Sequence, residues 1–348
     1  LLLATISIIY SSNKFYSAFR LIEHITFFVL SIVLIYQYDQ HFKKHAELIL
    51  NRMTSLLAAS LGTLVVAVWI FLILGNDVVW HRMAGESFGL GGMVIHVHTL
   101  SIASAILFFI LISKLFNPYY KKKYFIIFMA VISAITIALT LSRTGYIMFL
   151  LGCFILIYNT KNLRKYLLPI LFIVTASFSI FNFTIFEAAF EIFLRQQNFQ
   201  ELIQLSSRTI FWQEIIIDTF EESPFLGYGY QMMSHDGTTK VFESLGFIAR
   251  GNAHNTFVQT FSGLGVIGLA LLILNILLSI TTYTNFRKIY TELYKSHQIF
   301  MIMGLILLTL VASLTQYGIV GMTTPVVPVY LLCISYLSYF SLKDRIHI

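Results

Sequence analysis

The sequence has few charged residues for its length. Of its 348 residues, 11% are charged and 57% are hydrophobic. A soluble domain normally carries about 25% charged residues, because its surface must face water. The composition therefore excludes an ordinary soluble domain and indicates an integral membrane protein.

Cysteines and nucleotide-binding motifs are also scarce. The two cysteines, Cys153 and Cys333, lie in apolar runs, and two such thiols build neither a disulfide framework nor a metal site. The chain has no P-loop and no Asp-x-Asp pair, which argues against ATP hydrolysis and against a glycosyltransferase that holds a nucleotide sugar through a divalent metal. The sequence thus predicts no cofactor and no bound metal.

Long apolar runs, in contrast, are abundant. They are suited to cross about 30 Å of hydrocarbon at about 1.5 Å per residue, and they lack the alternation of barrel strands. The expected fold class is therefore all-α, a polytopic transmembrane bundle of about ten or more helices. Residues 1–10 are apolar but too few to span, and they look like the remnant of a helix whose start is missing. The predicted spans are 21–38, 55–74, 92–115, 124–141, 145–159, 166–183, 254–283, 299–317 and 324–342.

The basic residues predict the orientation of the bundle. Most of the 23 lysines and arginines lie in segments that share one side if the helices alternate. By the positive-inside rule that side is cytoplasmic. The net charge of +7 then follows from topology and from anionic lipid on the inner leaflet, and it needs no nucleic-acid partner. These segments are 39–54, 114–123, 159–166, 284–298 and 341–348.

One large connecting segment, residues 184–253, falls on the opposite, outer side of the membrane. We expect one membrane domain made of N-terminal helices (1–183), this loop, and C-terminal helices (254–348). Inside the loop, residues 185–205 and 207–220 have the pattern of helices that lie along a membrane interface. Acidic residues outnumber basic ones in the loop, so its few cations are candidates for a specific role.

His254 stands where this loop meets an apolar run. A nearby arginine, Arg250, and the start of a helix both disfavour a charged imidazole, so the ring should be neutral. A neutral histidine can act as a general base. The alternative is a structural histidine that only hydrogen-bonds the loop.

Two arginines are candidates for binding an anion. Arg143 stands beside Ser142 at a turn between two apolar runs, and Arg208 stands at the expected start of helix 207–220, with Ser206 or Ser207 as N-cap. A guanidinium binds phosphate oxygens in a two-pronged fashion, and free N–H groups at a helix start favour an anion. The alternatives are a snorkelling arginine at position 143 and a solvated loop arginine at position 208.

Other patterns are weaker. Arg82, in a second outer loop at residues 75–91, and Arg250 are further candidates for the same anion. The run Gly263-Leu-Gly265-Val-Ile-Gly268 matches GxGxxG, but it sits inside a membrane helix and favours close helix packing. His96 and His98 could bind a metal, although no third ligand follows at helical spacing.

Four motifs, in order, resemble the O-antigen ligase and polymerase superfamily. Ser142-Arg143-Thr144-Gly145 is similar to its SRxG segment, and Ser207-Arg208-Thr209-Ile-Phe-Trp212 is similar to its GRxxxW element, with serine in place of glycine. Pro224-Phe-Leu-Gly227-Tyr-Gly229 resembles PxxGxG, and His254-Asn255-Thr256-Phe257 followed by Gly265-Val-Ile-Gly268 resembles HNxxL…GxxG. Together they cover roughly residues 124–283.

The resemblance implies a metal-independent glycan transferase of the bacterial inner membrane, with its active site facing the periplasm. The donor would be an undecaprenyl-pyrophosphate-linked glycan and the acceptor lipid A-core, as in an O-antigen ligase. His254 would be the base, Arg143 and Arg208 would bind the pyrophosphate, and Ser142, Arg82, Arg250 and Asn255 would contact substrate. A polymerase that extends a growing glycan of O-antigen, capsule or exopolysaccharide is the nearest alternative. A polysaccharide or lipid-carrier transporter would need ionisable groups near mid-membrane, whereas most charges here lie at the surfaces.

Overall fold

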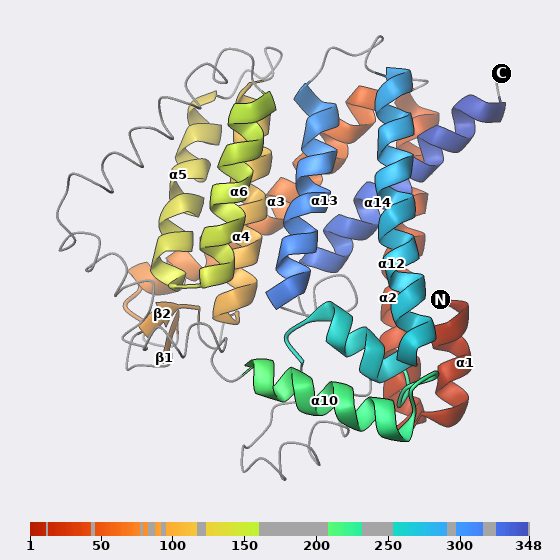
Figure 1. Cartoon of the computed structure of the whole chain (residues 1–348). Helices are drawn as coiled ribbons and strands as arrows, with labels where there is room; N and C mark the ends of the chain where they lie inside the picture. Colours follow the sequence, from red (N-terminus) through yellow and green to blue (C-terminus); the bar gives the residue numbers. More distant parts are fainter. Residues whose placement is uncertain are drawn as a thin grey trace, which may run out of the picture. The chain divides into compact units, whose positions relative to one another are not determined.

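The computed structural model is nearly all helical (Figure 1). It describes residues 1–11, 13–42, 46–76, 79–82, 88–91, 95–116, 123–159, 208–231, 253–290, 297–315 and 325–346. Among these residues, 5 helices are long and apolar enough to cross a membrane. The predicted helical membrane architecture is confirmed to this extent, whereas the number of spans and the side of loop 184–253 stay predictions. The long helices are α2 (Lys14–Phe42), α3 (Ala46–Ile73), α4 (Val97–Leu115), α5 (Lys123–Thr140) and α12 (Thr256–Tyr290).

The other helices also fall where the apolar pattern predicts them. The helix expected over 207–220 is α10, and the apolar start of the chain is α1. The apolar run 166–183, the expected interfacial helix 185–205 and Arg250 lie outside the described residues. These remaining helices are α1 (Leu2–Tyr10), α6 (Arg143–Asn159), α10 (Arg208–Glu222), α13 (His297–Thr315) and α14 (Val326–Ile346).

Residues 75–91 contain a short hairpin that the sequence pattern did not predict. There β1 (Trp80–Arg82) pairs antiparallel with β2 (Phe88–Leu90), with Arg82 opposite Phe88. The Gly91 N–H extends the pairing by donating to the Val79 carbonyl over 2.7 Å. Alternation over three residues is too short to be read in a sequence, which is why this hairpin was not predicted.

The described chain forms two compact units. The first comprises Leu1–Leu50, Gln204–Tyr294 and Thr309–Ile348, and the second comprises Asn51–Ile203 and Lys295–Leu308. In the first unit α2 packs on α1 and α14, while α12 packs on α10 and α14. In the second unit α4 packs on α5 and α6. The predicted division of the chain at residues 183 and 253 stays a prediction.

Small residues bring the helices of the second unit together. A Cβ on Gly152 of α6 would lie 3.3 Å from the ring of Phe109 on α4, and a Cβ on Gly304 of α13 would collide with the far end of the same ring. At the start of α6, a Cβ on Gly145 would collide with the Ser101 side chain. Glycine therefore sets the close approach of α6 and α13 to α4.

In the first unit, α12 is broken at Gly265. This glycine has φ 64° and ψ −163°, which is outside the helical region. The break separates the Ser262 carbonyl from the Val266 N–H, its usual partner four residues later in a helix. Both groups lie within an apolar span, where an unsatisfied backbone group costs several kcal/mol.

The segment Ser223–Gln231 supplies the missing partners. It follows α10 and lies against the break, so that its backbone pairs with the backbone of α12. Gly227 (φ 65°) and Gly265 make this approach sterically feasible, since a Cβ on Gly227 would meet the Ser262 oxygen and a Cβ on Gly265 would meet Phe225. The three bonds run from Tyr228 N–H to Ser262 O (2.9 Å), from Gly229 N–H to Gly263 O (2.9 Å) and from Val266 N–H to Pro224 O (2.8 Å).

This arrangement corrects the expectation for the GxGxxG run. Gly263 and Gly265 do not mediate contact between two helices; they allow a non-helical segment to approach a broken one. Gly268 differs, because a Cβ there would meet the side chain of Leu264 in its own helix. The pattern therefore marks a helix break that is covered from outside.

The first two helices cover the other side of the same segment. The Tyr10 hydroxyl donates to the Leu226 carbonyl over 2.8 Å. The Tyr230 N–H donates to Ser7 Oγ over 3.0 Å, and Ser17 Oγ donates to the Tyr230 carbonyl over 2.8 Å. Residues 223–231 are thus held between α12 on one side and α1 and α2 on the other.

Replacing Gly265 by alanine should destabilise the protein by about 3 kcal/mol or more, because the new Cβ meets the Phe225 backbone in a left-handed conformation. Gly75→Ala is a matched control, since Gly75 has a similar φ of 68° and nothing within 4 Å of its Cβ position. That control should cost about 1 kcal/mol. Thermal unfolding of the purified variants in detergent measures the loss of stability in each. Equal losses in the two variants would show that the close approach of Phe225 to Gly265 does not contribute to stability.

Candidate functional site

The start of α12 holds His254 in a constrained turn. His254 has φ 48°, a left-handed conformation that non-glycine residues seldom adopt, and its side chain is half-buried. Asn255 Oδ1 then accepts the N–H groups of Phe257 (2.9 Å) and Val258 (3.3 Å), which caps the helix. Asn255 Nδ2 donates to the Leu314 carbonyl over 3.3 Å. Asn255 therefore fixes the turn that carries His254, and its predicted contact with substrate stays a prediction.

Helix α10 is anchored to this turn. The Trp212 indole N–H donates to the Ala253 carbonyl over 2.6 Å, directly before His254. Around this bond Phe211 and Ile215 of α10 pack with Ala253 and Val258 in an apolar cluster. The cluster fixes the first turns of α10 and α12 against each other.

Arg208 is the first residue of α10, four residues before Trp212. One helical turn therefore separates Arg208 from the residue that bonds next to His254. The structure describes only the backbone of Arg208. In the first unit, the fold thus brings the backbone of Arg208, a predicted anion-binding residue, close to the turn of His254, the predicted base.

Arg143 lies in the second unit, where two helices begin together. It is the first residue of α6 and is half-buried. The preceding Ser142 is fully buried, and its Oγ is hydrogen-bonded to Nδ1 of His98 over 3.1 Å. His98 is in the first turn of α4, so the positive ends of two helix dipoles meet at this point. Two adjacent helix starts favour an anion. The role of Arg143 in binding one stays a prediction.

The candidates thus fall into two sets. The turns of Arg208, His254 and Asn255 belong to the first unit, and Ser142 and Arg143 belong to the second. Their convergence into one pocket stays a prediction. Arg82, whose backbone alone is described, lies in the hairpin of the second unit.

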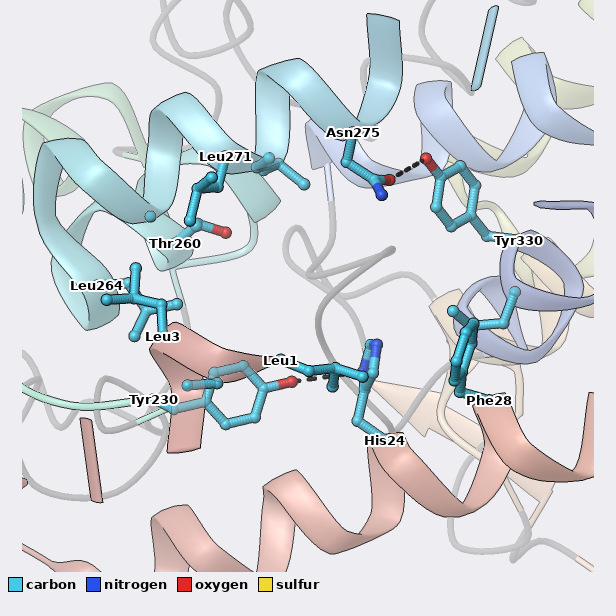
Figure 2. Close-up of a pocket in the computed structure, with 14 residues that line it drawn as sticks. Leu1, Leu3, His24, Phe28, Tyr230, Thr260, Leu264, Leu271, Asn275 and Tyr330 are labelled. Atoms are coloured by element: carbon cyan, nitrogen blue, oxygen red, sulfur yellow. Dashed lines mark hydrogen bonds between the residues drawn. The ribbon is translucent and has the colours of Figure 1, made fainter. Parts of the chain in front are cut away.

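A cavity of about 330 Å³ lies in the first unit beside Tyr230 (Figure 2). One wall is α12 from Thr260 to Asn275, and most of the lining is apolar. Two polar pairs interrupt it: the Tyr230 hydroxyl lies 3.4 Å from His24 Nδ1, and the Tyr330 hydroxyl donates to Asn275 Oδ1 over 2.8 Å. The cavity can hold hydrocarbon along the helix that starts beside His254.

The side chain of Tyr228 connects segment 223–231 back to α10, the helix that precedes it. Its hydroxyl lies 2.8 Å from Asp218 Oδ2 and 3.1 Å from Glu222 Oε2. Burial, the hydrogen bond to Asp218 and the two negative charges raise the pKa of the Tyr228 phenol above its usual value, so it remains a donor. Burial likewise raises the pKa of the Tyr230 phenol.

Within the described residues no group of three or more His, Cys, Asp or Glu side chains could hold a metal ion. His96 and His98 lie near each other, with ring centroids 5.3 Å apart. His98 is instead engaged with Ser142, a contact that sequence reasoning missed because 44 residues separate the two.

The comparison with known families supports the resemblance of the four sequence motifs to a single family. Residues 128–273 match the family model described as O-antigen ligase. This segment is similar to the O-antigen ligase family. The resemblance predicted from the four motifs is confirmed, and the matched residues include Arg143, Arg208 and His254. Together with the apolar helices, the match identifies a multi-pass membrane protein with a function of the O-antigen ligase or polymerase type. No curated protein matches the chain.

Replacing Trp212 by phenylalanine should lower glycan transfer about tenfold or more, because a loss near 1–2 kcal/mol loosens the turn that carries His254. Trp69→Phe is the matched control: the Trp69 indole donates to Thr136 Oγ1 over 2.8 Å within the second unit. Both variants should lose similar thermal stability, but only Trp212→Phe should lose activity. Comparable activity of the Trp212→Phe and Trp69→Phe variants would show that the Trp212 bond does not contribute to glycan transfer.

Proposed function

We propose that the protein transfers a glycan from an undecaprenyl pyrophosphate carrier to an acceptor hydroxyl on the periplasmic side of the bacterial inner membrane. The observation that supports this most directly is the bond from Trp212 to Ala253. This bond connects the motif that contains Arg208 and Trp212 to the motif that begins at His254. As a result α10, which starts at Arg208, lies beside the turn of His254. A base next to an anion-binding group is the combination that such a transfer needs.

His254 is the proposed general base. It accepts the proton of the acceptor hydroxyl while that oxygen attacks the anomeric carbon of the donor sugar. The bond from this carbon to the phosphate oxygen breaks, and its electron pair leaves with the pyrophosphate. The N-terminus of α12 disfavours an imidazolium, which supports a neutral ring ready to take the proton.

Arg143 and Arg208 are the proposed ligands of the pyrophosphate. Each is the first residue of a helix, so a guanidinium and free backbone N–H groups are available in the same place. They would stabilise the negative charge that builds on the leaving group. Arg82, Arg250, Ser142 and Asn255 remain weaker candidates for contacts to substrate.

The cavity beside α12 supports a lipid-linked donor. Its wall runs from Thr260, one turn into the helix, to Asn275, deeper in the apolar span. A hydrocarbon chain lying there would place its polar end near the turn of His254.

The proposed acceptor is lipid A-core, which makes the protein an O-antigen ligase. A polymerase that adds repeats to O-antigen, capsule or exopolysaccharide is the second candidate, because it uses the same donor and the same base. A transporter of polysaccharide or lipid carrier is a third. The family match favours the first two over the third.

Replacing His254 by alanine should reduce glycan transfer at least about 100-fold, since the general base is lost. The assay is a gel of surface glycans from the native host carrying the variant as its only copy. His297→Ala, in the segment predicted to be cytoplasmic, is the control and should leave the glycan pattern unchanged.

The pattern on the gel also separates the two transferases. Polymer missing from lipid A-core, with lipid-linked polymer accumulating, identifies a ligase. A single repeat on the core identifies a polymerase. A normal pattern from a stable His254→Ala protein would reject the histidine as base.

Replacing Arg143 by lysine should lower transfer about 100-fold, nearly as much as Arg143→Ala, because lysine keeps the charge but cannot bind two phosphate oxygens at once. Arg287→Lys, on the predicted cytoplasmic side, should have no effect. The measurement is transfer by purified protein in lipid vesicles. Full activity of the lysine variant would mean that charge alone is enough at position 143.

A further inference from the structure

The turn between α5 and α6 has a strained backbone. Leu141 has φ 50°, a left-handed conformation that residues with a side chain seldom adopt. Ser142 and Arg143 follow it directly, and the Ser142 carbonyl accepts the Tyr146 N–H over 3.1 Å at the start of α6. Such a conformation persists only where neighbouring groups hold it. The groups that hold this turn therefore determine where Arg143, the first residue of α6, is placed.

Helix α4 supplies a hydrogen bond that holds the turn. The Ser142 side chain is fully buried, and its Oγ is bonded to Nδ1 of His98 over 3.1 Å. His98 is the second residue of α4 and lies outside residues 128–273, the segment that matches the family. The bond thus connects a histidine that belongs to none of the four motifs to the residue directly before Arg143.

A packing contact one turn further along α4 supports the same arrangement. Ser101 lies three residues after His98, on the same side of the helix. A Cβ on Gly145, the third residue of α6, would collide with the Ser101 side chain, so the two helices approach closely at this level. The hydrogen bond to Ser142 and the contact at Gly145 lie at successive levels of the same pair of helices. Together they fix both the position and the direction of the first turn of α6.

The position of this turn matters for the proposed role of Arg143. A guanidinium that binds two phosphate oxygens at once must be held at a suitable distance and angle. A misplacement of about 1 Å in a group that positions a substrate can cost about 100-fold in rate. Arg143 is half-buried, so its side chain extends from a packed part of the helix. A shift of the backbone at Ser142 would therefore move the guanidinium as well.

We propose that His98 is a positioning residue of the transferase: it holds the start of α6 through Ser142 and so fixes the point from which Arg143 reaches the pyrophosphate. This inference rests on the proposed function of Arg143, and it requires no contact between His98 and the substrate. The bond serves this purpose whichever atom donates, because Nδ1 is a donor in one tautomer of the ring and an acceptor in the other.

Replacing His98 by phenylalanine or by asparagine tests the bond itself. Phenylalanine keeps a ring but has no nitrogen, so His98→Phe should lower transfer by purified protein in lipid vesicles about tenfold or more. Asparagine carries a polar atom near the position of Nδ1, so His98→Asn should recover most of that loss. Equal losses in the two variants, or full activity of His98→Phe, would overturn the proposal.

Thr136→Val is the control for stability. This variant removes the acceptor of the Trp69 indole N–H, just as His98→Phe removes the partner of the Ser142 hydroxyl. Both variants should lower the thermal unfolding temperature by similar amounts, but only His98→Phe should lose transfer. Transfer that falls in both variants in proportion to their stability would show that His98 is merely structural.

A double variant shows whether His98 acts through the arginine. Once alanine replaces Arg143, the position of the guanidinium no longer matters, so His98→Phe combined with Arg143→Ala should transfer glycan at the same rate as Arg143→Ala alone. A further loss in the double variant would show that His98 acts independently of Arg143 and would reject the positioning role.

The single variant Arg143→Ala separates the two proposals. Full activity of Arg143→Ala would reject Arg143 as a ligand of the pyrophosphate, and the positioning role would be rejected with it. Loss of transfer in Arg143→Ala together with full activity of His98→Phe would reject the positioning role alone.

Discussion

The structure of the first unit depends on a backbone pairing at the break in α12. A helix in an apolar span must satisfy its own N–H and C=O groups, and Gly265 prevents this for Ser262 and Val266. The segment from Pro224 to Gly229 replaces the lost partner on both sides of the break. The broken helix and the segment are therefore stable only together.

The pairing explains why motifs that are distant in sequence belong together. The segment follows directly from α10, so its position against α12 places α10 across the N-terminal part of that helix (Figure 1). The bond from Trp212 to Ala253 and the apolar cluster around it then fix the other end of α10. As a result, the turn that carries His254 is held from both directions, by its own cap at Asn255 and by α10.

The helices could be predicted well from the sequence. Apolar runs of sufficient length predicted α2 to α6 and α12 to α14, because the requirement for internal backbone bonds leaves few other structures in a membrane. The spacing of apolar residues likewise predicted α10. In contrast, the hairpin of β1 and β2 is too short for a periodic signal, and the break at Gly265 looked like a site of helix packing because glycine serves both purposes.

The candidate site could be predicted only in part. The motifs pointed to His254, Arg143 and Arg208, and the structure shows that each lies at or directly before the start of a helix. The partners that fix these starts were not predictable. The contact of Ser142 with His98 and that of Asn255 with Leu314 join residues with no sequence pattern in common, and they become visible only when helices are packed.

The break in α12 also has a mechanical consequence. The short N-terminal part of the helix, from Thr256 to Leu264, is joined to the segment after α10 by backbone bonds, and the turn just before it is joined to α10 by the Trp212 bond. These bonds make α10, the segment after it and the start of α12 one connected body on the N-terminal side of Gly265. The distance between the backbone of Arg208 and the turn of His254 is therefore fixed within that body.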